Sequence, residues 1–294
     1  MSVKEQQNLP KSLRLPNILF VGPQRSGTTW IWEYLRARGD IVLPEGVKET
    51  WFFSSMFHKG VGWYASHFKP MKDYSAIIEV DPTLFSHPEA PRRVREILGS
   101  DVLIVITVRN PVERSWSHYL HARRYGWTEK PLEQAVQEIP DIIEASRYSK
   151  HIPRWKSVVG EKCVIILHHE ALDQDPHSFV SDMCSAIGLP LVNIPERLLK
   201  TRVNIGRDVR SQILIRIATR LSNWLRSYQM YSVIDFVKRM GIRRMLYKPL
   251  NEGYSLHPRD KAMLFELLKE EYDFLSFLNS DENPSSNQNS RGSK

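Results

Sequence analysis

The sequence predicts an α/β fold of three layers, in which a central parallel β-sheet lies between two layers of helices. Two observations support this prediction. Short runs of β-branched and apolar residues alternate along the chain with longer segments of helical periodicity. The runs are almost continuously apolar, as expected of strands that are buried on both faces of a sheet. Four runs are expected to form strands: 17–21, 76–80, 102–108 and 163–168.

Helical patterns fill the stretches between these runs. We expect helices over 28–38, 88–98, 111–125, 147–158 and 176–187. The third has the clearest start, because Asn110 is suited to cap its N-terminus and Pro111 to occupy its first turn. We find no internal repeat and no Pro- or Gly-rich linker, so residues 15–278 are expected to form a single domain.

Composition narrows the class of protein but not its ligand. The chain has 294 residues, of which 41% are hydrophobic and 25% charged, as in ordinary globular proteins. Its net charge of +8 indicates an anionic ligand or surface, without choosing between nucleic acid, lipid headgroup and phosphorylated small molecule. Two cysteines are too few for a disulfide framework or a cysteine metal site, and Cys163 is expected to be a small core residue.

The two ends of the chain offer little to bury. Residues 1–14 lack an apolar stretch of signal-peptide length, and residues 279–294 are mainly Ser, Asn and charged residues. We expect both segments to be flexible tails. The longest apolar run lies around 102–108 and is too short to span a bilayer. We therefore expect a cytoplasmic protein without an integral membrane segment.

Residues 200–257 differ from the rest of the chain. Twelve Lys and Arg stand against two acids between positions 200 and 250, and apolar residues recur at helical spacing over 213–225. This pattern predicts a basic helical insertion, or cap, before a final helix over 258–278. The basic residues either form a solvated face on a packing helix or draw an anionic substrate or cofactor toward the site. A membrane-surface role is less favoured, because the charges spread around the helix.

The loop after the first run is similar to a phosphate-binding loop but lacks its lysine. Gly22, Gly27 and Thr29 fit the G-x-x-x-x-G-K-[ST] pattern, whereas Thr28 occupies the lysine position. The nearby cation is Arg25, inside the loop. A strand, a glycine-containing turn and a helix N-terminus together bring several backbone N–H groups to one point, which favours an anion.

A second anion site is predicted at the end of the run 102–108. A magnesium-dependent nucleotide hydrolase or kinase usually places an Asp at the end of such a strand, to hold the metal. Here the residue is Arg109, which repels a metal ion and attracts an anion. The expected ligand therefore has two separate anionic groups and no magnesium.

These segments resemble sulfotransferases that use 3′-phosphoadenosine 5′-phosphosulfate (PAPS). "PQRSGTTW" resembles the family's 5′-phosphosulfate loop, P-K-S-G-T-T-W, and "VRNPVERSWSHY" is similar to its 3′-phosphate motif, with Arg109 and Ser117 at the gripping positions. "KETWFF" is close to the K-E-x-x-F-F segment of heparan-type sulfotransferases. The similarity covers residues 15–190 and thins over 200–257. It implies a P-loop-like fold, a PAPS site and no metal.

The resemblance also implies roles for individual residues. Arg25 matches the loop lysine that contacts the leaving oxygen. Arginine offers two parallel N–H bonds but no proton at neutral pH, so we assign it charge stabilisation. Trp30 stands where the family often stacks the adenine, although it could equally pack the first helix on the sheet. The donor-binding residues implied are Arg25, Ser26, Gly27, Thr28, Thr29, Trp30, Arg109, Ser117 and Arg207.

Two residues are candidates for the base that takes the acceptor's proton. Glu49 matches the proposed general base of the glycosaminoglycan branch, and Lys48 beside it is expected to contact the donor sulfate or the product phosphate. His121 matches a histidine of the N-sulfotransferase type, and an imidazole with an ordinary pKa of about 6.5 suits this task. Both assignments stay open: Glu49 and Lys48 could form a structural ion pair, and His121 or its neighbour His118 could be an ordinary helix residue.

The expected function is sulfuryl transfer from PAPS to a hydroxyl or amine of a small molecule, such as a secondary metabolite, with 3′-phosphoadenosine 5′-phosphate (PAP) as product. Three alternatives remain: a carbohydrate sulfotransferase, a kinase with an atypical P-loop, and a non-catalytic protein that binds anions or nucleic acid through the basic region. The missing loop lysine and the Arg at position 109 speak against the kinase. We expect no nucleic-acid partner.

Overall fold

The computed structural model describes residues 14–69, 72–200, 207–209, 221, 247–249 and 255–282, with only the backbone of 207–209, 247–249 and 279–282. The expected cap over 200–257 lies almost wholly outside these residues. What is described of it is a two-stranded antiparallel ladder, in which β6 (Arg207–Val209) pairs with β7 (Tyr247–Pro249). β6 contacts α5 (Pro111–Arg124).

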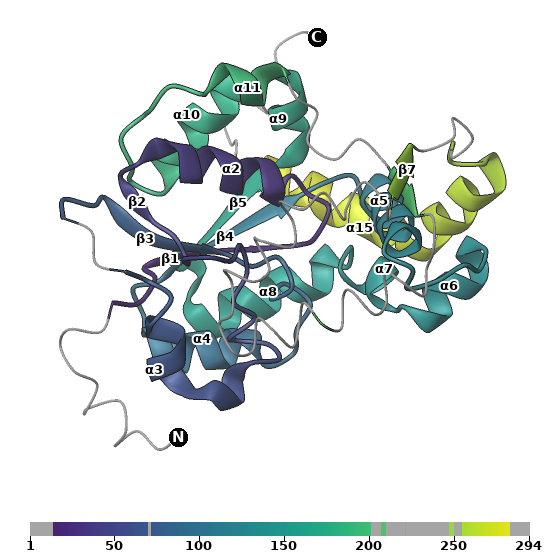
Figure 1. Cartoon of the computed structure of the whole chain (residues 1–294). Coiled ribbons are helices and arrows are strands. Elements are labelled where there is room, and N and C mark those ends of the chain that lie inside the picture. Colours follow the sequence, from purple (N-terminus) through teal and green to yellow (C-terminus); the bar gives the residue numbers. More distant parts are fainter. Residues whose placement is uncertain are drawn as a thin grey trace, which may run out of the picture.

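A five-stranded parallel sheet forms the centre of the molecule, in the order β2-β3-β1-β4-β5 (Figure 1). The strands are β1 (Ile18–Gly22), β2 (Ile41–Val42), β3 (Ala76–Val80), β4 (Leu103–Val108) and β5 (Val164–His168). The four expected strands are confirmed within one residue at each end. The short β2 was not expected, because two residues carry too little pattern to indicate a strand.

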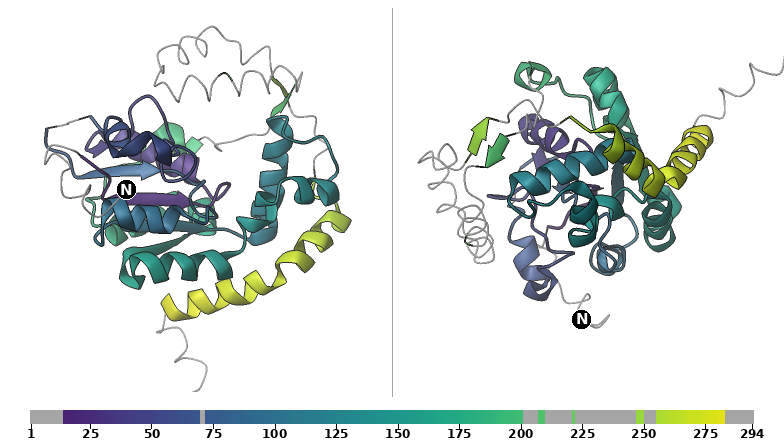
Figure 2. Two further views of the ribbon diagram at one scale, coloured as in Figure 1. Left: turned by 90° about the horizontal axis from the view of Figure 1, so that it is seen from below. Right: turned by 90° about the vertical axis from the view of Figure 1, so that its right-hand side faces the viewer.

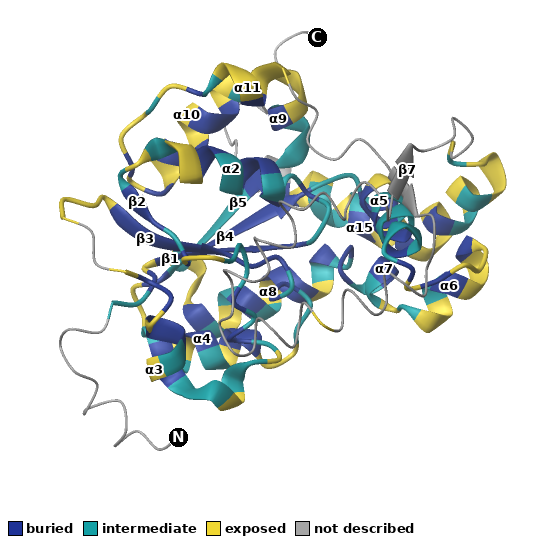
Figure 3. Ribbon diagram, in the orientation of Figure 1, coloured by how far each residue is buried: buried dark blue, intermediate teal, exposed yellow. Residues whose placement is uncertain are grey.

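Helices cover both faces of the sheet, which confirms the predicted three layers (Figure 1). One face carries α2 (Thr28–Arg38), α9 (His169–Gln174), α10 (Pro176–Ala186) and α11 (Glu196–Lys200). The other face carries α3 (Gly60–Ala65), α4 (Ala90–Leu98) and α8 (Tyr148–Val159). Successive residues of β1 alternate between the two cores, since Ile18 and Phe20 pack with α2 and α10, whereas Leu19 and Val21 pack with α4 and α8. The buried sides of the helices face the sheet (Figure 3).

A third apolar cluster lies beside the sheet, beyond the end of β4. It joins α5 to α6 (Leu132–Glu138), α7 (Asp141–Glu144) and the long C-terminal helix α15 (Pro258–Glu282). Figure 2 shows α15 running alongside α5 and α8, and its Glu271 accepts hydrogen bonds from the backbone N–H (2.8 Å) and hydroxyl (2.9 Å) of Ser149. These bonds hold the C-terminal helix against α8, and the third apolar cluster holds it against α5, which carries much of the candidate site.

The expected helices agree with the structure within two residues at each end, apart from the last. Asn110 caps α5 as predicted, because its side chain accepts the N–H of Glu113 at 3.1 Å. α15 continues to Glu282, into the segment that we expected to be flexible. The expectation for Cys163 is wrong: it is half-buried at the edge of the core, and Cys184 is the buried cysteine. No helix in the described part of the chain has the length and apolar character needed to cross a membrane.

Candidate active site

The loop between β1 and α2 has the backbone of an anion-binding turn. Gly22, Arg25 and Gly27 have φ values of 99°, 73° and 84°, in the left-handed region. Gly22 is required, because a Cβ there would lie 2.6 Å from the Cα of Pro82. Arg25 adopts a left-handed backbone conformation, which costs a residue other than glycine about 1–3 kcal/mol. Residues with such backbone strain are concentrated at functional sites.

The start of α2 directs backbone N–H groups toward this loop. Gly27 precedes the helix and has no side chain to cap it, so the first amides of α2 can bind an anion. The hydroxyl of Ser26 instead donates to the carbonyl of Pro23 at 2.6 Å and holds the turn together. Thr28 is buried and Thr29 is half-buried at the first turn of the helix. The predicted loop residues thus surround one helix N-terminus.

The Arg25 side chain joins the loop to α5. Its Nε donates to the hydroxyl of Ser117 at 3.1 Å, and its Nη1 lies 3.5 Å from Nδ1 of His121. Burial, together with the positive charges of Arg124 and Arg109, lowers the pKa of Arg25 to about 10. None of its contacts with the described residues is to a carboxylate. Among the described residues, the half-buried guanidinium therefore has no anionic partner.

Arg109 reaches the same loop from the end of β4. Its Nη1 donates to the carbonyl of Arg25 at 3.1 Å, and its Nη2 lies 3.2 Å from the exposed carboxylate of Glu113. Its buried Nε has no hydrogen-bond partner among the described residues. The hydroxyl of Tyr148 bonds both the backbone N–H and the carbonyl of Arg109, at 3.1 and 2.8 Å, and fixes this strand end. Arg109 is thus held in place, and among the described residues its Nε–H group remains available to donate to a ligand.

Lys48 and Glu49 lie beside the first turn of α2. The Lys48 ammonium is 3.0 Å from Oε1 of Glu49 and 3.5 Å from the hydroxyl of Thr29. The indole N–H of Trp51 donates to Oε2 of Glu49 at 3.2 Å. The ion pair that we kept as the alternative is therefore present, and it adjoins the loop that the donor is expected to occupy. The pair is compatible with a structural role and with catalysis.

His121 faces Arg25, but the expectation of an ordinary pKa is wrong. Burial lowers the pKa of His121 to about 3, with further contributions from the positive charges of Arg25, Arg124 and Lys48. Its imidazole is therefore neutral at pH 7 and a weak proton acceptor. His118 is buried, and its Nδ1 lies 3.2 Å from Nη1 of Arg114. Of the two histidines on this helix, only His121 adjoins the loop arginine.

The adenine-stacking role expected for Trp30 is not supported by its position. The indole is 7% exposed and stacks on Tyr34, with ring centroids 6.2 Å apart. Its N–H donates to the carbonyl of Leu198 at 3.2 Å. Trp30 thus packs α2 against the sheet and α11, as in the alternative that we left open. The backbone of Arg207 lies in β6, and its side chain lies outside the described residues.

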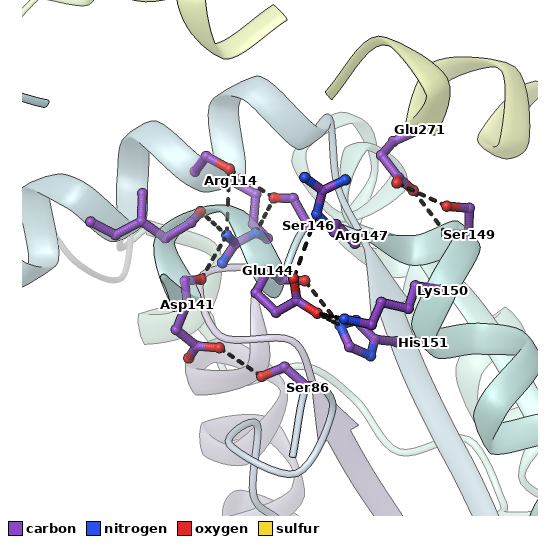
Figure 4. A network of polar contacts seen from close by, with 12 residues as sticks. Ser86, Arg114, Asp141, Glu144, Ser146, Arg147, Ser149, Lys150, His151 and Glu271 are labelled. Atoms are coloured by element: carbon purple, nitrogen blue, oxygen red, sulfur yellow. Dashed lines mark hydrogen bonds and ion pairs between the residues drawn. The ribbon is translucent and has the colours of Figure 1, made fainter. Parts of the chain in front are cut away.

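Two further residues support the loop, although the sequence did not single them out for this. His169, directly after β5, lies against Gly27: its Cδ2 would be 3.0 Å from a Cβ added there. Arg114 is completely buried, and its Nη1 donates to the carbonyl of Gln24 at 3.2 Å. Figure 4 shows how Arg114 also binds Ser146 and the carbonyl of Asp141. Position after a buried strand was the available signal for His169, whereas Arg114 lies inside the motif of residues 108–119 but was given no role there.

An acid also lies beside the loop, at the end of β3. The backbone N–H of Asp81 donates to the carbonyl of Phe20 in β1 at 3.0 Å. Its Oδ1 accepts the N–H (3.1 Å) and hydroxyl (2.6 Å) of Thr83, and its Oδ2 has no partner among the described residues. Burial raises the pKa of Asp81 well above its usual value, and the charges of Glu49 and Glu79 raise it further. The sequence prediction considered a metal-holding acid only at the end of the strand before Arg109, whereas Asp81 follows β3.

Comparison with known proteins identifies the family. The family model described as "Sulfotransferase domain" matches residues 15–205, which include the loop, Glu49, Arg109 and the whole of α5. The chain belongs to the sulfotransferase family. This confirms the resemblance inferred from the two phosphate-binding motifs.

Curated relatives of this sulfotransferase include larger proteins. Bifunctional heparan sulfate N-deacetylase/N-sulfotransferase 1 from Xenopus laevis is 26% identical over 197 residues, which cover 60% of this chain and 22% of the relative. The membrane-associated sulfotransferase kil1 of Dictyostelium discoideum is 34% identical over 174 residues, which cover 53% of this chain and 36% of the relative. The chain therefore spans well under half the length of these relatives.

A solved structure supports the fold of this sulfotransferase. The crystal structure of a sulfotransferase from Alicyclobacillus acidocaldarius aligns with a TM-score of 0.52 at 22% identity. The alignment covers 63% of this chain and 88% of the other. The P-loop-like α/β architecture that the resemblance implied is thereby confirmed.

Proposed function

We propose that this protein transfers a sulfuryl group from PAPS to a hydroxyl or amine of a small-molecule acceptor and releases PAP. The observation that carries the proposal is the convergence of two motifs, far apart in sequence, on Arg25. Its side chain bonds Ser117 at 3.1 Å, and its carbonyl accepts from Arg109 at 3.1 Å. The two expected anion sites are therefore adjacent, as a ligand with two anionic groups on one nucleotide requires.

The donor supplies an activated sulfuryl group, and the residues around it bind and orient its charged ends. The amides of the loop and the hydroxyls of Thr28 and Thr29 are suited to hold the 5′-phosphosulfate. Arg109 and Ser117 are suited to hold the 3′-phosphate. Arg25 stabilises negative charge that develops on the leaving phosphate oxygen, a form of preorganised electrostatic stabilisation.

Glu49 is our candidate for the base. The neutral His121, with a pKa of about 3, binds a proton too weakly to accept one efficiently at neutral pH. Glu49 is anchored by Lys48 and Trp51, so its carboxylate has a fixed orientation beside the loop. We assign His121 a hydrogen-bonding role, toward Arg25 and the acceptor.

A carbohydrate acceptor is the second candidate. It is favoured by the relatives named as heparan sulfate N-sulfotransferases and by the "KETWFF" segment that holds Glu49. We prefer a small molecule, because Lys48 and Glu49 of that segment adjoin the donor loop and so bear on the chemistry rather than on the choice of acceptor. Incubation with ³⁵S-labelled PAPS, with either a metabolite extract or N-desulfated heparin as acceptor, distinguishes the two.

Thermal unfolding in the presence of adenosine nucleotides tests the donor site. We expect PAP to raise the midpoint of unfolding in a saturable manner, because a ligand that binds only the folded state stabilises it. ATP with Mg²⁺, which lacks the 3′-phosphate, serves as the control and is expected to have a smaller effect. No stabilisation by PAP, or stabilisation by ATP that depends on Mg²⁺, would refute the proposal and favour the kinase.

A further inference from the structure

An acid interrupts the apolar pattern of β3. Glu79 is the fourth residue of this strand, and only 1% of it is exposed. Its neighbours Ile78 and Val80 pack in the core that contains α2, so the Glu79 side chain faces the opposite core, which includes Tyr64 of α3. A buried carboxylate destabilises a protein unless it is well hydrogen-bonded. An acid at this position of a central strand therefore needs an explanation.

Three donors converge on the Glu79 carboxylate. Its Oε1 accepts the backbone N–H of Thr50 at 2.9 Å and the Thr50 hydroxyl at 2.6 Å. Its Oε2 accepts the hydroxyl of Tyr64 at 2.6 Å. Burial raises the pKa of Glu79, and these hydrogen bonds oppose the rise because they stabilise the ionised form. Burial and the negative charge of Glu79 raise the pKa of Tyr64 well above its usual value, so the phenol keeps its proton and remains a donor.

Thr50 lies in the segment that carries Glu49. It is buried, and its hydroxyl also accepts the N–H of Phe52 at 3.1 Å. Trp51, between these two residues, has a φ of 56°, in the left-handed region that residues other than glycine rarely adopt. From this backbone position its indole N–H donates to Oε2 of Glu49 at 3.2 Å. The bonds from Thr50 to Glu79 therefore fix, from the core side, a turn that also holds the Glu49 carboxylate.

We infer that Glu79 is a positioning residue for Glu49. It anchors the turn of residues 50–52 to the central sheet, and this turn orients the Glu49 carboxylate through Trp51. The inference rests on the proposed function, in which Glu49 takes the proton of the acceptor. Glu79 lies opposite Leu19 of β1, the strand that leads into the donor loop, so adjacent strands hold the base and the loop. A base must lie within hydrogen-bond reach of its proton, and a misplacement of about 1 Å can lower the rate roughly a hundredfold.

Thr50→Val tests this anchor, because valine keeps the branched shape of threonine and removes the hydroxyl that joins Glu79 to Phe52. With the full chain, saturating ³⁵S-labelled PAPS and a metabolite extract or N-desulfated heparin as acceptor, we expect the initial rate to fall by about tenfold or more. The rise in Tm caused by PAP should be unchanged. Thr50→Ser, which restores the hydroxyl, should recover most of the rate. In Glu49→Gln protein, adding Thr50→Val should cause no further loss, because no base remains to be positioned.

The indole N–H resonance of Trp51 reports on the contact with Glu49 without any acceptor. In ¹⁵N-labelled protein, with the resonance assigned by Trp51→Phe, it should move in Thr50→Val and stay in place in Thr50→Ser. Ser149→Ala is the matched control, because the N–H and hydroxyl of Ser149 donate in the same way to the buried Glu271, which lies in α15. This control should lower Tm about as much as Thr50→Val, by roughly 2–4 °C, without changing the rate or the Trp51 resonance.

Tyr64→Phe removes the third donor to Glu79 and provides a second, milder test should Thr50→Val fail to fold. It should lower the rate less than Thr50→Val and move the Trp51 resonance in the same direction. An unchanged rate, or a lower rate with an unmoved Trp51 resonance, would overturn the positioning role. Full activity of Glu49→Gln would instead overturn the base assignment, and with it the inference, while PAP binding stands. A shifted Trp51 resonance in a protein that PAP does not stabilise would support the anchor and refute the donor site.

Discussion

Arg25 is expected to destabilise the ligand-free protein, so Arg25→Met should make that protein more stable while abolishing PAP binding. The pKa of this side chain falls from its ordinary value to about 10 in the folded protein, chiefly because of burial. Because one pKa unit corresponds to about 1.4 kcal/mol, keeping the charge buried costs roughly 3 kcal/mol. The unfolded state holds the proton more tightly than the folded state. The cost is therefore fully present below pH 10 and disappears as the pH rises toward the ordinary pKa of an arginine side chain.

Methionine keeps most of the apolar stem and removes the charge. It also removes a charge-assisted hydrogen bond to Ser117, worth about 2 kcal/mol, and a contact with His121 that at 3.5 Å is at the limit of hydrogen-bonding distance. The backbone strain at φ 73° is unchanged, since Met is no better suited to it than Arg. The net expectation is a gain of about 1 kcal/mol, or a rise in Tm of roughly 2–4 °C. Arg25 would then lower the stability of the ligand-free protein while providing ligand binding, as is common at binding sites.

Urea unfolding with and without PAP measures both effects. Arg38→Met is the control, because Arg38 is also buried but binds both carboxylate oxygens of Asp40 at 2.9 Å. That pairing raises the pKa of Arg38, so its loss should lower the free energy of unfolding by about 1.5–3 kcal/mol. If ligand-free Arg25→Met proves less stable than wild type, or still gains stability from PAP, the reasoning about an uncompensated cation is refuted.

Two further outcomes follow from the same site. Glu49→Gln should lower kcat by about a hundredfold or more while PAP still raises Tm, and full activity in that variant would remove Glu49 from the base role. Acid should destabilise the protein through His121, whose pKa is about 3 when folded and near 6.5 when unfolded. The unfolded state binds the proton first, so this stability is intact above about pH 6.5 and lost as the pH falls toward 3, by roughly 2 kcal/mol at pH 5. A His121→Asn variant should show a shallower loss in urea unfolding measured between pH 7 and 5; an identical loss would refute the assignment.

The fold and the donor loop could be predicted from the sequence because local patterns encode them. Buried parallel strands are continuously apolar, and the carboxyl ends of β1 and β4 had to lie together once both belonged to one sheet. The contact between Arg109 and the carbonyl of Arg25 follows from that arrangement. Gly22 and Gly27 were recognisable because the turn needs positive φ at both positions.

The environment of individual side chains could not be predicted in this way. Trp30 is a core residue because α11, which supplies the carbonyl of Leu198, covers it from 168 positions away. The pKa of His121 is low because burial acts together with Arg25 and Lys48 from other segments and with Arg124, one turn along the same helix. The burial of Trp30 and His121 and the approach of Arg25 and Lys48 leave no trace in the neighbouring residues. Sequence patterns therefore indicated which residues belong to the site, and only the fold revealed their protonation and exposure.

Asp81, beside the loop between β1 and α2, changes the argument against a magnesium-dependent kinase. The sequence prediction rested on β4, which is followed by Arg109 and not by an acid. Yet β3, the neighbour of β1, is followed directly by Asp81. A carboxyl must be ionised to bind a metal. Burial and the negative charges of Glu49 and Glu79 raise the pKa of Asp81, and its Oδ1 is already occupied by Thr83. Burial therefore disfavours the ionised form of Asp81 that a metal would need, and the positive charge that a nucleotide requires at this loop is provided by arginine side chains.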